Sequence, residues 1–167
     1  RAADTTLLIS ENEANLFRTR VSNMHQIDLQ VMRNGIDATF FAPDAVKPEP
    51  TLYGPGPNLV FTGQMDYAPN VAAVERMAQR ILPAIREVHR NAEFHIVGRA
   101  PTPAVKTLAK RAGVTVWGEV PDVRPYLAEA DIVVAPLMIA RGIQNKVLEA
   151  MAMAKPVVLS PEAATGI

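Results

Sequence analysis

The side chains best suited to chemistry lie within residues 141–151, where a short loop leads into a run with helical periodicity. Asn145 and Lys146 precede Glu149 by four and three residues, and side chains at these spacings share one face of a helix. An ammonium group such as that of Lys146 pairs with phosphate, and a carboxylate such as that of Glu149 accepts hydrogen bonds from a ribose diol. The spacing therefore indicates a nucleotide-binding face, although an ordinary exposed ion pair between Lys146 and Glu149 fits it as well.

The start of the same helix offers a second means of binding an anion. Its first amide groups have no partner within the helix, and the helix dipole adds partial positive charge there. We expect the amides near Gly142 and Ile143 to contribute, with Gly142 allowing a close approach of the backbone. Arg141 adds a full charge, unless its side chain lies free in solvent. These groups predict a nucleoside diphosphate with its phosphates at the helix start and its ribose further along.

From about residue 58 onward, short apolar runs alternate with segments of helical periodicity. This alternation predicts strand–helix–strand crossovers and hence an α/β fold, a Rossmann-like parallel sheet with helices on both faces. The expected strands are Leu59–Thr62, Glu93–Val97, Val114–Trp117, Asp131–Ala135 and Pro156–Leu159.

Glycines follow two of these strands. Ligands of open parallel sheets bind beyond the carboxyl ends of the strands. Gly63 follows the first expected strand and Gly98-Arg99 the second, so both loops should meet residues 141–151 at one edge of the sheet. We expect all three residues in the site, whereas glycines that merely end a strand would have no such role.

The expected helices have recognisable apolar faces. One stripe runs from Val71 to Val88, and Pro83 should kink or divide that helix because it lacks an amide donor. A later helix is expected over residues 144–154. Its core-facing side chains would be Val147, Leu148 and Met151.

The chain divides into three parts. Residues 1–40 contain two strand-like runs and a helix, which Ser10 and Glu13 begin with a capping box. The many prolines in residues 41–57 predict an extended connector. Residues 58–167 form the α/β domain, and both ends of the chain look like cuts through a longer protein.

Composition excludes several classes of function. Lys and Arg number 17, as do Asp and Glu, and this balance argues against nucleic-acid binding. The absence of cysteine rules out disulfides, zinc–thiolate sites and cysteine nucleophiles. The sequence has no dinucleotide-binding, P-loop, hydrolase-elbow or acidic metal-binding motif, and no apolar run long enough to span a membrane.

The ordered set of motifs resembles glycosyltransferase family 4. Residues 141–158 are similar to the donor-site motif of that family, and residues 34–37 (Asn-Gly-Ile-Asp) to its interdomain segment. The strand ends at 59–63, 94–98, 118–122 and 131–136 extend the resemblance over nearly the whole chain. Pro69-Asn70 is similar to a bacterial branch associated with exopolysaccharides.

The resemblance implies a GT-B architecture, in which two Rossmann-like domains face each other across a cleft. Residues 1–40 would end the acceptor-side domain and include the crossover, and residues 58–167 would be the nucleotide-sugar-binding domain without its C-terminal elements. By this resemblance Glu149 holds the donor ribose and Lys146 the diphosphate. Because the ends of adjacent expected strands converge, we further expect Arg141 at the diphosphate and Gly98, Arg99 and Val120 near the base. The chain departs from the family in two places, because Arg141 replaces its first glutamate and Gln64 its usual arginine.

The implied reaction transfers a sugar from a UDP- or GDP-linked donor to a glycan or lipid-linked acceptor with retention of configuration, in exopolysaccharide or lipopolysaccharide synthesis. No metal and no cofactor are expected, because the helix start and its cations would stabilise the departing diphosphate. We expect a cytoplasmic protein that can associate with the inner face of the membrane. We expect no transfer by this chain alone, because the acceptor domain is missing. Two alternatives stay open, a nucleotide-sugar epimerase of GT-B architecture and a non-catalytic nucleotide-binding or interaction domain.

Overall fold

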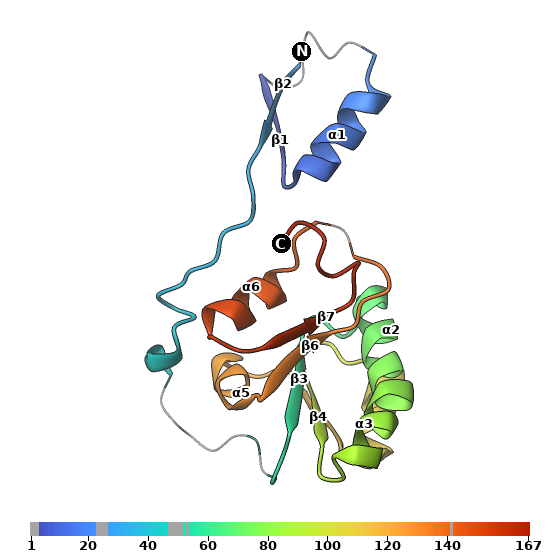
Figure 1. Ribbon diagram of the computed structural model, residues 1–167. Coiled ribbons are helices and arrows are strands. Elements are labelled where there is room, and N and C mark those ends of the chain that lie inside the picture. The colour runs from blue at the N-terminus through green and yellow to red at the C-terminus, as the bar shows by residue number, and fades with distance from the viewer. Residues whose placement is uncertain (1–3, 23–26, 47–51, 53, 141) are drawn as a thin grey trace.

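The computed structural model describes residues 4–22, 27–46, 52, 54–140 and 142–167. Its main feature is a five-stranded sheet in the order β5-β4-β3-β6-β7, with every neighbouring pair parallel (Figure 1). The strands are β3 (Asn58–Thr62), β4 (Glu93–Val97), β5 (Val114–Gly118), β6 (Ile132–Ala135) and β7 (Val157–Leu159). Each expected strand is present within one residue at either end, and the α/β fold class is confirmed.

Helices cover both faces of this sheet, as expected (Figure 1). One face packs against α2 (Ala68–Arg76), α3 (Leu82–Val88) and α4 (Pro103–Thr107), which is followed by a 3-10 turn, Leu108–Lys110. The other face packs against α5 (Arg124–Glu129) and α6 (Asn145–Ala152). Alternation along β3 explains the two layers, because Phe61 joins the first core and Val60 the second.

Proline divides the long helix of residues 68–88, as predicted. A π-helical turn, Met77–Ile81, joins α2 to α3, and Pro83 lies in the first turn of α3. The wider turn frees the backbone from the missing amide of the proline. The apolar stripe ends earlier than expected, since the side chain of Val88 is 79% exposed. Its assignment to the core was wrong: Val88 is the last residue of α3, and its side chain faces solvent.

The buried face of α6 differs from the predicted one. Val147 is buried as expected, but the second contact with the sheet is made by Ala150, and Met151 is 53% exposed. The small side chain of Ala150 lets the helix approach the sheet closely, and this turns Met151 outward. The prediction that Met151 faces the core was therefore wrong.

Residues 5–22 and 27–31 form a separate small unit of two parallel strands and a helix. Its elements are β1 (Thr5–Leu8), α1 (Glu11–Arg20) and β2 (Asp28–Val31). The Ser10 hydroxyl accepts a hydrogen bond from the Glu13 amide at 3.2 Å, which confirms the predicted start of the helix. Between β2 and β3 the described chain has one 3-10 turn, Pro43–Ala45. The extent of the three predicted domains stays a prediction.

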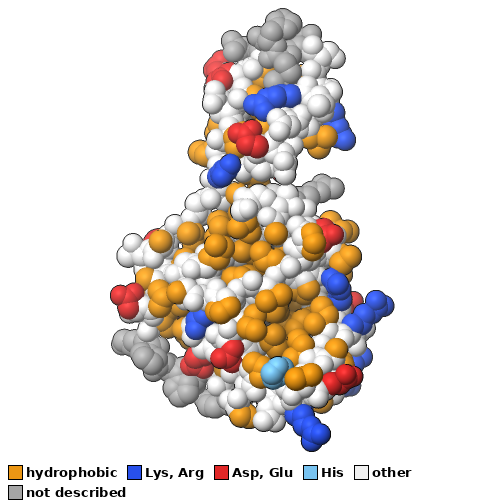
Figure 2. Space-filling model, viewed as in Figure 1, with side chains coloured by type: hydrophobic (Ala, Val, Ile, Leu, Met, Phe, Trp, Pro, Cys, Tyr) orange, Lys and Arg blue, Asp and Glu red, His pale blue; other side chains and the backbone are white. Residues whose placement is uncertain are grey.

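Strand β7 forms one edge of the five-stranded sheet. Its central residue, Val158, is 58% exposed. Figure 2 shows apolar side chains gathered on the side of the molecule where β7 lies. None of the helices in the described part of the chain is long and apolar enough to cross a membrane.

Candidate functional site

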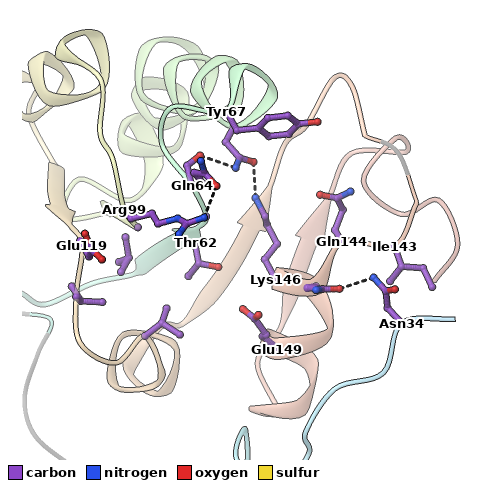
Figure 3. Close-up of a pocket in the computed structure, with 17 residues that line it drawn as sticks. Asn34, Thr62, Gln64, Tyr67, Arg99, Glu119, Ile143, Gln144, Lys146 and Glu149 are labelled. Carbon is purple, nitrogen blue, oxygen red and sulfur yellow. Dashed lines mark hydrogen bonds between the residues drawn. The ribbon is translucent and has the colours of Figure 1, made fainter. Parts of the chain in front are cut away.

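A cavity of about 570 Å³ lies at the carboxyl ends of the strands, where binding sites of parallel sheets are expected (Figure 3). Its walls come from the loops after β3, β4 and β5, from the first turns of α6, and from the crossover residue Asn34. Seven of the residues predicted for the site line it: Gly63, Gly98, Arg99, Val120, Ile143, Lys146 and Glu149.

Two predicted residues are not among these. Gly142 lies outside this cavity and borders another one, against α1. A side chain at Gly142 would meet the end of the Ile9 side chain, and its φ of +63° suits glycine. The close approach that Gly142 allows is therefore to the small unit, and its expected place at a phosphate needs correction. Arg141 lies outside the described residues.

The two glycines after β3 and β4 bring their backbones into contact. The Gly63 amide donates to the carbonyl of Val97 at 3.0 Å, and the Gly98 amide to the carbonyl of Gly118 at 2.8 Å. A Cβ atom at Gly98 would overlap the carbonyl oxygen of Gly63, so no larger residue fits. These glycines bring the ends of β3 and β4 together under the cavity. They therefore do more than end a strand, which was the alternative role considered for them.

Lys146 extends from the first turn of α6 toward Gly63. Its ammonium donates to the Asn70 side-chain oxygen at 2.7 Å and lies 4.2 Å from the centre of the Phe61 ring. A Cβ atom at Gly63 would come within 2.9 Å of the Lys146 Nζ, so glycine leaves the room that this ammonium occupies. Burial lowers the pKa of Lys146 to about 8, although the nearby Glu149 opposes the shift.

Glu149 borders the cavity one turn further along α6. Burial raises the pKa of its carboxyl, and the charge of Lys146 acts against that change. Within the described residues no ion pair joins the two side chains, because the Lys146 ammonium is bonded to Asn70 instead. Lys146 and Glu149 therefore do not form the ordinary exposed ion pair that the spacing also allowed.

The open amides of the α6 start belong to different residues from those predicted. The helix begins at Asn145, after Gln144 in the cap position, and has no side-chain cap. Its first-turn donors are therefore the amides of Asn145 and Lys146, two to three residues later than Gly142 and Ile143. The Asn145 side chain accepts from Asn34 at 2.8 Å, which ties the crossover to this helix.

The family model for glycosyl transferases group 1 matches residues 56–166. The chain belongs to this family. Its matched region contains the whole five-stranded sheet and all the predicted site residues. No curated protein matches the chain.

Solved glycosyltransferase structures share the fold of this group 1 chain. A glycosyltransferase from Rickettsia africae is 17% identical, with a TM-score of 0.70 over 95% of this chain and 44% of its own. A sucrose-phosphate synthase from Thermosynechococcus elongatus is 20% identical, with a TM-score of 0.71 over 95% and 41%. The Anabaena protein HepE, in complex with UDP and glucose, is 14% identical, with a TM-score of 0.66 over 95% and 45%. The chain thus spans less than half the length of these structures.

Further residues that line the group 1 site were not predicted, and among them are Asn34, Thr62, Gln64 and Asn70. Gln64 accepts from the Arg99 guanidinium at 2.9 Å, and the Thr62 hydroxyl is a buried polar atom for which the described residues supply no partner. Asn34 and Asn70 lie in segments that carry the family resemblance, and Gln64 stands where the family usually has arginine, so the resemblance was one signal for them. Position after β3 is a second signal for Thr62, Gln64 and Asn70, because the carboxyl end of a central strand borders the crevice.

Acidic and imidazole groups do not cluster in the described part of the group 1 chain. Over those residues, no group of three or more His, Cys, Asp or Glu side chains is placed to hold a metal ion. Independence from metals stays a prediction.

Proposed function

We propose that this chain is the nucleotide-sugar-binding half of a retaining family 4 glycosyltransferase, and that its cavity holds the nucleoside diphosphate of the donor. The observation that supports this most directly is the shared position of Lys146 and Glu149. Both extend from the first two turns of α6 into one cavity, and the glycine-rich ends of β3 and β4 border the same space (Figure 3). An ammonium next to a helix start suits phosphate, and a carboxylate beyond it suits a ribose diol.

The chemistry of the proposed reaction depends on stabilising the departing diphosphate. As the glycosidic bond breaks, negative charge builds on the phosphate oxygens while the sugar gains oxocarbenium character. Preorganised donors at that place lower the barrier because they need no reorganisation. Lys146 and the open amides at the start of α6 would supply such donors, and so would Arg141 if it lies as proposed. The same groups would allow transfer without a metal ion.

The other end of the cavity would hold the base. Gly98, Arg99 and Val120 border it there, where β4 and β5 end. The Anabaena structure contains UDP and glucose, which favours a UDP-linked donor for this chain, and GDP stays the second candidate. The family match favours a transferase over the epimerase considered above.

The remaining parts of the proposal concern the whole protein. The acceptor, a glycan or a lipid-linked sugar, would bind through a second domain, since the chain spans under half of the structures it matches. We propose synthesis of exopolysaccharide or lipopolysaccharide in the cytoplasm, at the inner face of the membrane. Without the second domain, this chain should bind nucleotide but transfer no sugar.

Calorimetry with UDP and GDP tests the proposed site. Lys146→Ala and Glu149→Ala should each weaken binding by about 10- to 100-fold, because each removes one charge-assisted contact worth about 1.5–3 kcal/mol. Lys110→Ala and Glu87→Ala make the same changes at exposed positions outside the cavity and should leave affinity as it was. Unchanged affinity in both cavity variants would reject the assignment.

A further inference from the structure

The segment 64–70, called the β3–α2 loop below although its last residues form the first turn of α2, holds two cations of the cavity, each through a neutral amide. The side-chain oxygen of Asn70 accepts from the Lys146 ammonium at 2.7 Å, and that of Gln64 accepts from the Arg99 guanidinium at 2.9 Å. The Asn70 side-chain nitrogen also donates to the backbone carbonyl of Gln64 at 2.9 Å, which links the two residues. Segments that are 35 and 76 residues away from this loop thus meet on it.

The chemistry of its partners fixes the orientation of the Asn70 side chain. A backbone carbonyl only accepts hydrogen bonds and an ammonium only donates them. The amide nitrogen must therefore point to Gln64, and the oxygen to Lys146. Asn70 is buried, so its neighbours hold this orientation before any ligand arrives.

Lys146 keeps unused donors in this arrangement. An ammonium has three N–H groups, and one of them is directed at Asn70. The Phe61 ring covers one side of the nitrogen at 4.2 Å, and the bond to Asn70 uses one N–H group, so a donor remains for a ligand on the cavity side. Neutral partners leave the positive charge of Lys146 uncancelled, whereas a carboxylate in place of Asn70 would neutralise it.

Arg99 is held in a similar way on the other side of the loop. In Figure 3 its guanidinium extends from the β4 end toward Gln64 at the cavity wall. Arginine has five N–H donors, and the single bond to Gln64 occupies one. Two cations therefore face one cavity from opposite sides of a single loop.

We propose that Gln64 and Asn70 are positioning residues that hold Arg99 and Lys146 through neutral side chains, so that both cations stay available to the diphosphate of the ligand. This inference rests on the proposed function, because it takes Lys146 as an anion-binding group of the donor site. It also changes one assignment, since Arg99 would serve the diphosphate rather than the base. The loop would not touch the sugar or the base, so its effect should appear in binding of the diphosphate.

Isosteric acidic substitutions test the proposal in the chain as it stands. Asn70→Asp and Gln64→Glu keep the shape of each side chain and place a carboxylate beside its cation. UDP binding, measured by calorimetry, should weaken by about tenfold or more in each, because the cation is neutralised before the ligand arrives. Uridine, which has no phosphate, should show no corresponding loss. The matched controls Asn91→Asp and Gln79→Glu add the same charge at exposed positions outside the cavity and should change UDP binding little.

An NMR titration of the Lys146 side chain provides a readout that a merely structural role would not move. Asn70→Asp should raise the pKa of Lys146, and Asn70→Ala should lower it because the ammonium loses its acceptor. Gln64→Glu changes an exposed side chain, so it keeps the test open if the buried position tolerates no change.

The outcomes separate the two proposals. If Lys146→Ala weakens UDP binding while Asn70→Asp and Gln64→Glu do not, the positioning role is overturned and the donor site stands. If Lys146→Ala and Glu149→Ala both leave binding unchanged, the donor site is rejected, and the positioning role is rejected with it. A pKa of Lys146 that is the same in wild type, Asn70→Asp and Asn70→Ala also overturns the positioning role.

Discussion

Two basic side chains of this group 1 domain are bonded to the side-chain oxygen of an asparagine, and they differ in what surrounds them. His95 on β4 lies 3.1 Å from Asn58, and Lys146 on α6 lies 2.7 Å from Asn70. Burial lowers the pKa of both bases. His95 is enclosed, with 2% of its surface exposed, whereas Lys146 borders the cavity. We call His95 with Asn58 the closed site, because it is shut off from solvent, and Lys146 with Asn70 the open site, because it borders the cavity. The same pairing of a base with an asparagine can thus stabilise the sheet in a closed site and bind a ligand in an open one.

Both ring nitrogens of His95 have a hydrogen-bond partner. The Trp117 indole N–H donates to His95 Nδ1 at 3.3 Å, so the proton of the neutral ring lies on Nε2 and is donated to Asn58. The Glu93 carboxylate is 3.7 Å from Nε2 and is the charged group nearest to the ring. Nothing in this arrangement is left over for a ligand, in contrast to the spare donors of Lys146.

The largest effect is expected from opening the closed site. His95→Ala should reduce the free energy of unfolding by about 3 kcal/mol, because it leaves a cavity and removes the partner of the buried Asn58 and the half-buried Trp117. Denaturant unfolding measures this loss. His89→Ala, an exposed histidine at the end of α3, is the matched control and should cost much less. A loss for His95→Ala no greater than for His89→Ala would contradict a structural role for the closed site.

The next effect concerns the open site at alkaline pH. Because the free Lys146 has a pKa of about 8 and the diphosphate binds its charged form, UDP affinity should fall as pH rises from 7 to 9. The decrease should approach about tenfold per pH unit above 8. Lys146→Arg keeps its charge in this range, so its affinity should stay level. A wild-type profile as flat as that of Lys146→Arg would mean that the ammonium does not contact the anion.

The sequence predicts those features of the fold that depend on neighbouring residues better than those that depend on residues far apart in the chain. Apolar runs, prolines and caps act locally, and they predicted every strand of the large sheet and the break at Pro83. Helix faces were predicted less well. Met151 is exposed because Ala150, not Met151, makes the close contact with the sheet, and periodicity alone cannot tell which of two neighbouring residues does so.

The candidate site was predicted where residue types are distinctive. Gly63, Gly98, Lys146 and Glu149 stand out by type and spacing, and all four line the cavity. The amides that hold the cations were missed, because Asn70 is 76 residues from its partner Lys146 and such pairs follow from topology alone. The enclosed histidine was missed for the same reason, since Asn58 and Trp117 meet it only through the pairing of strands.

A smaller effect is expected from protonating the closed site. The folded-state pKa of His95 lies below its unfolded value of 6.5, so the unfolded chain takes up the proton first as pH falls. Stability is therefore unaffected by this group above pH 6.5 and decreases below it, until the folded pKa is passed. His95→Gln can keep the bond to Asn58 and cannot titrate, so its stability should depend less on pH between 6.5 and 5. Identical pH slopes in the two proteins would exclude His95 as the source.

The smallest effect should come from removing the charge of the open site. Lys146→Met keeps an apolar stem against Phe61 and ends the cost of desolvating an ammonium that has only a neutral partner. The oxygen of Asn70 loses its donor but can bond to water in the cavity, so the free energy of unfolding should change by less than about 1 kcal/mol. At the same time, UDP binding should weaken as it does in Lys146→Ala. The cost of desolvating the ammonium is present below pH 8. It is relieved as pH rises from about 8 toward 10.5, because the folded chain loses the proton of Lys146 before the unfolded chain does. The stability of the wild type should therefore rise over this range relative to that of Lys146→Met. If Lys146→Met were as destabilising as His95→Ala, Lys146 would stabilise the fold in the same way as His95. Its position at the border of a cavity would then not explain why a lysine is placed there.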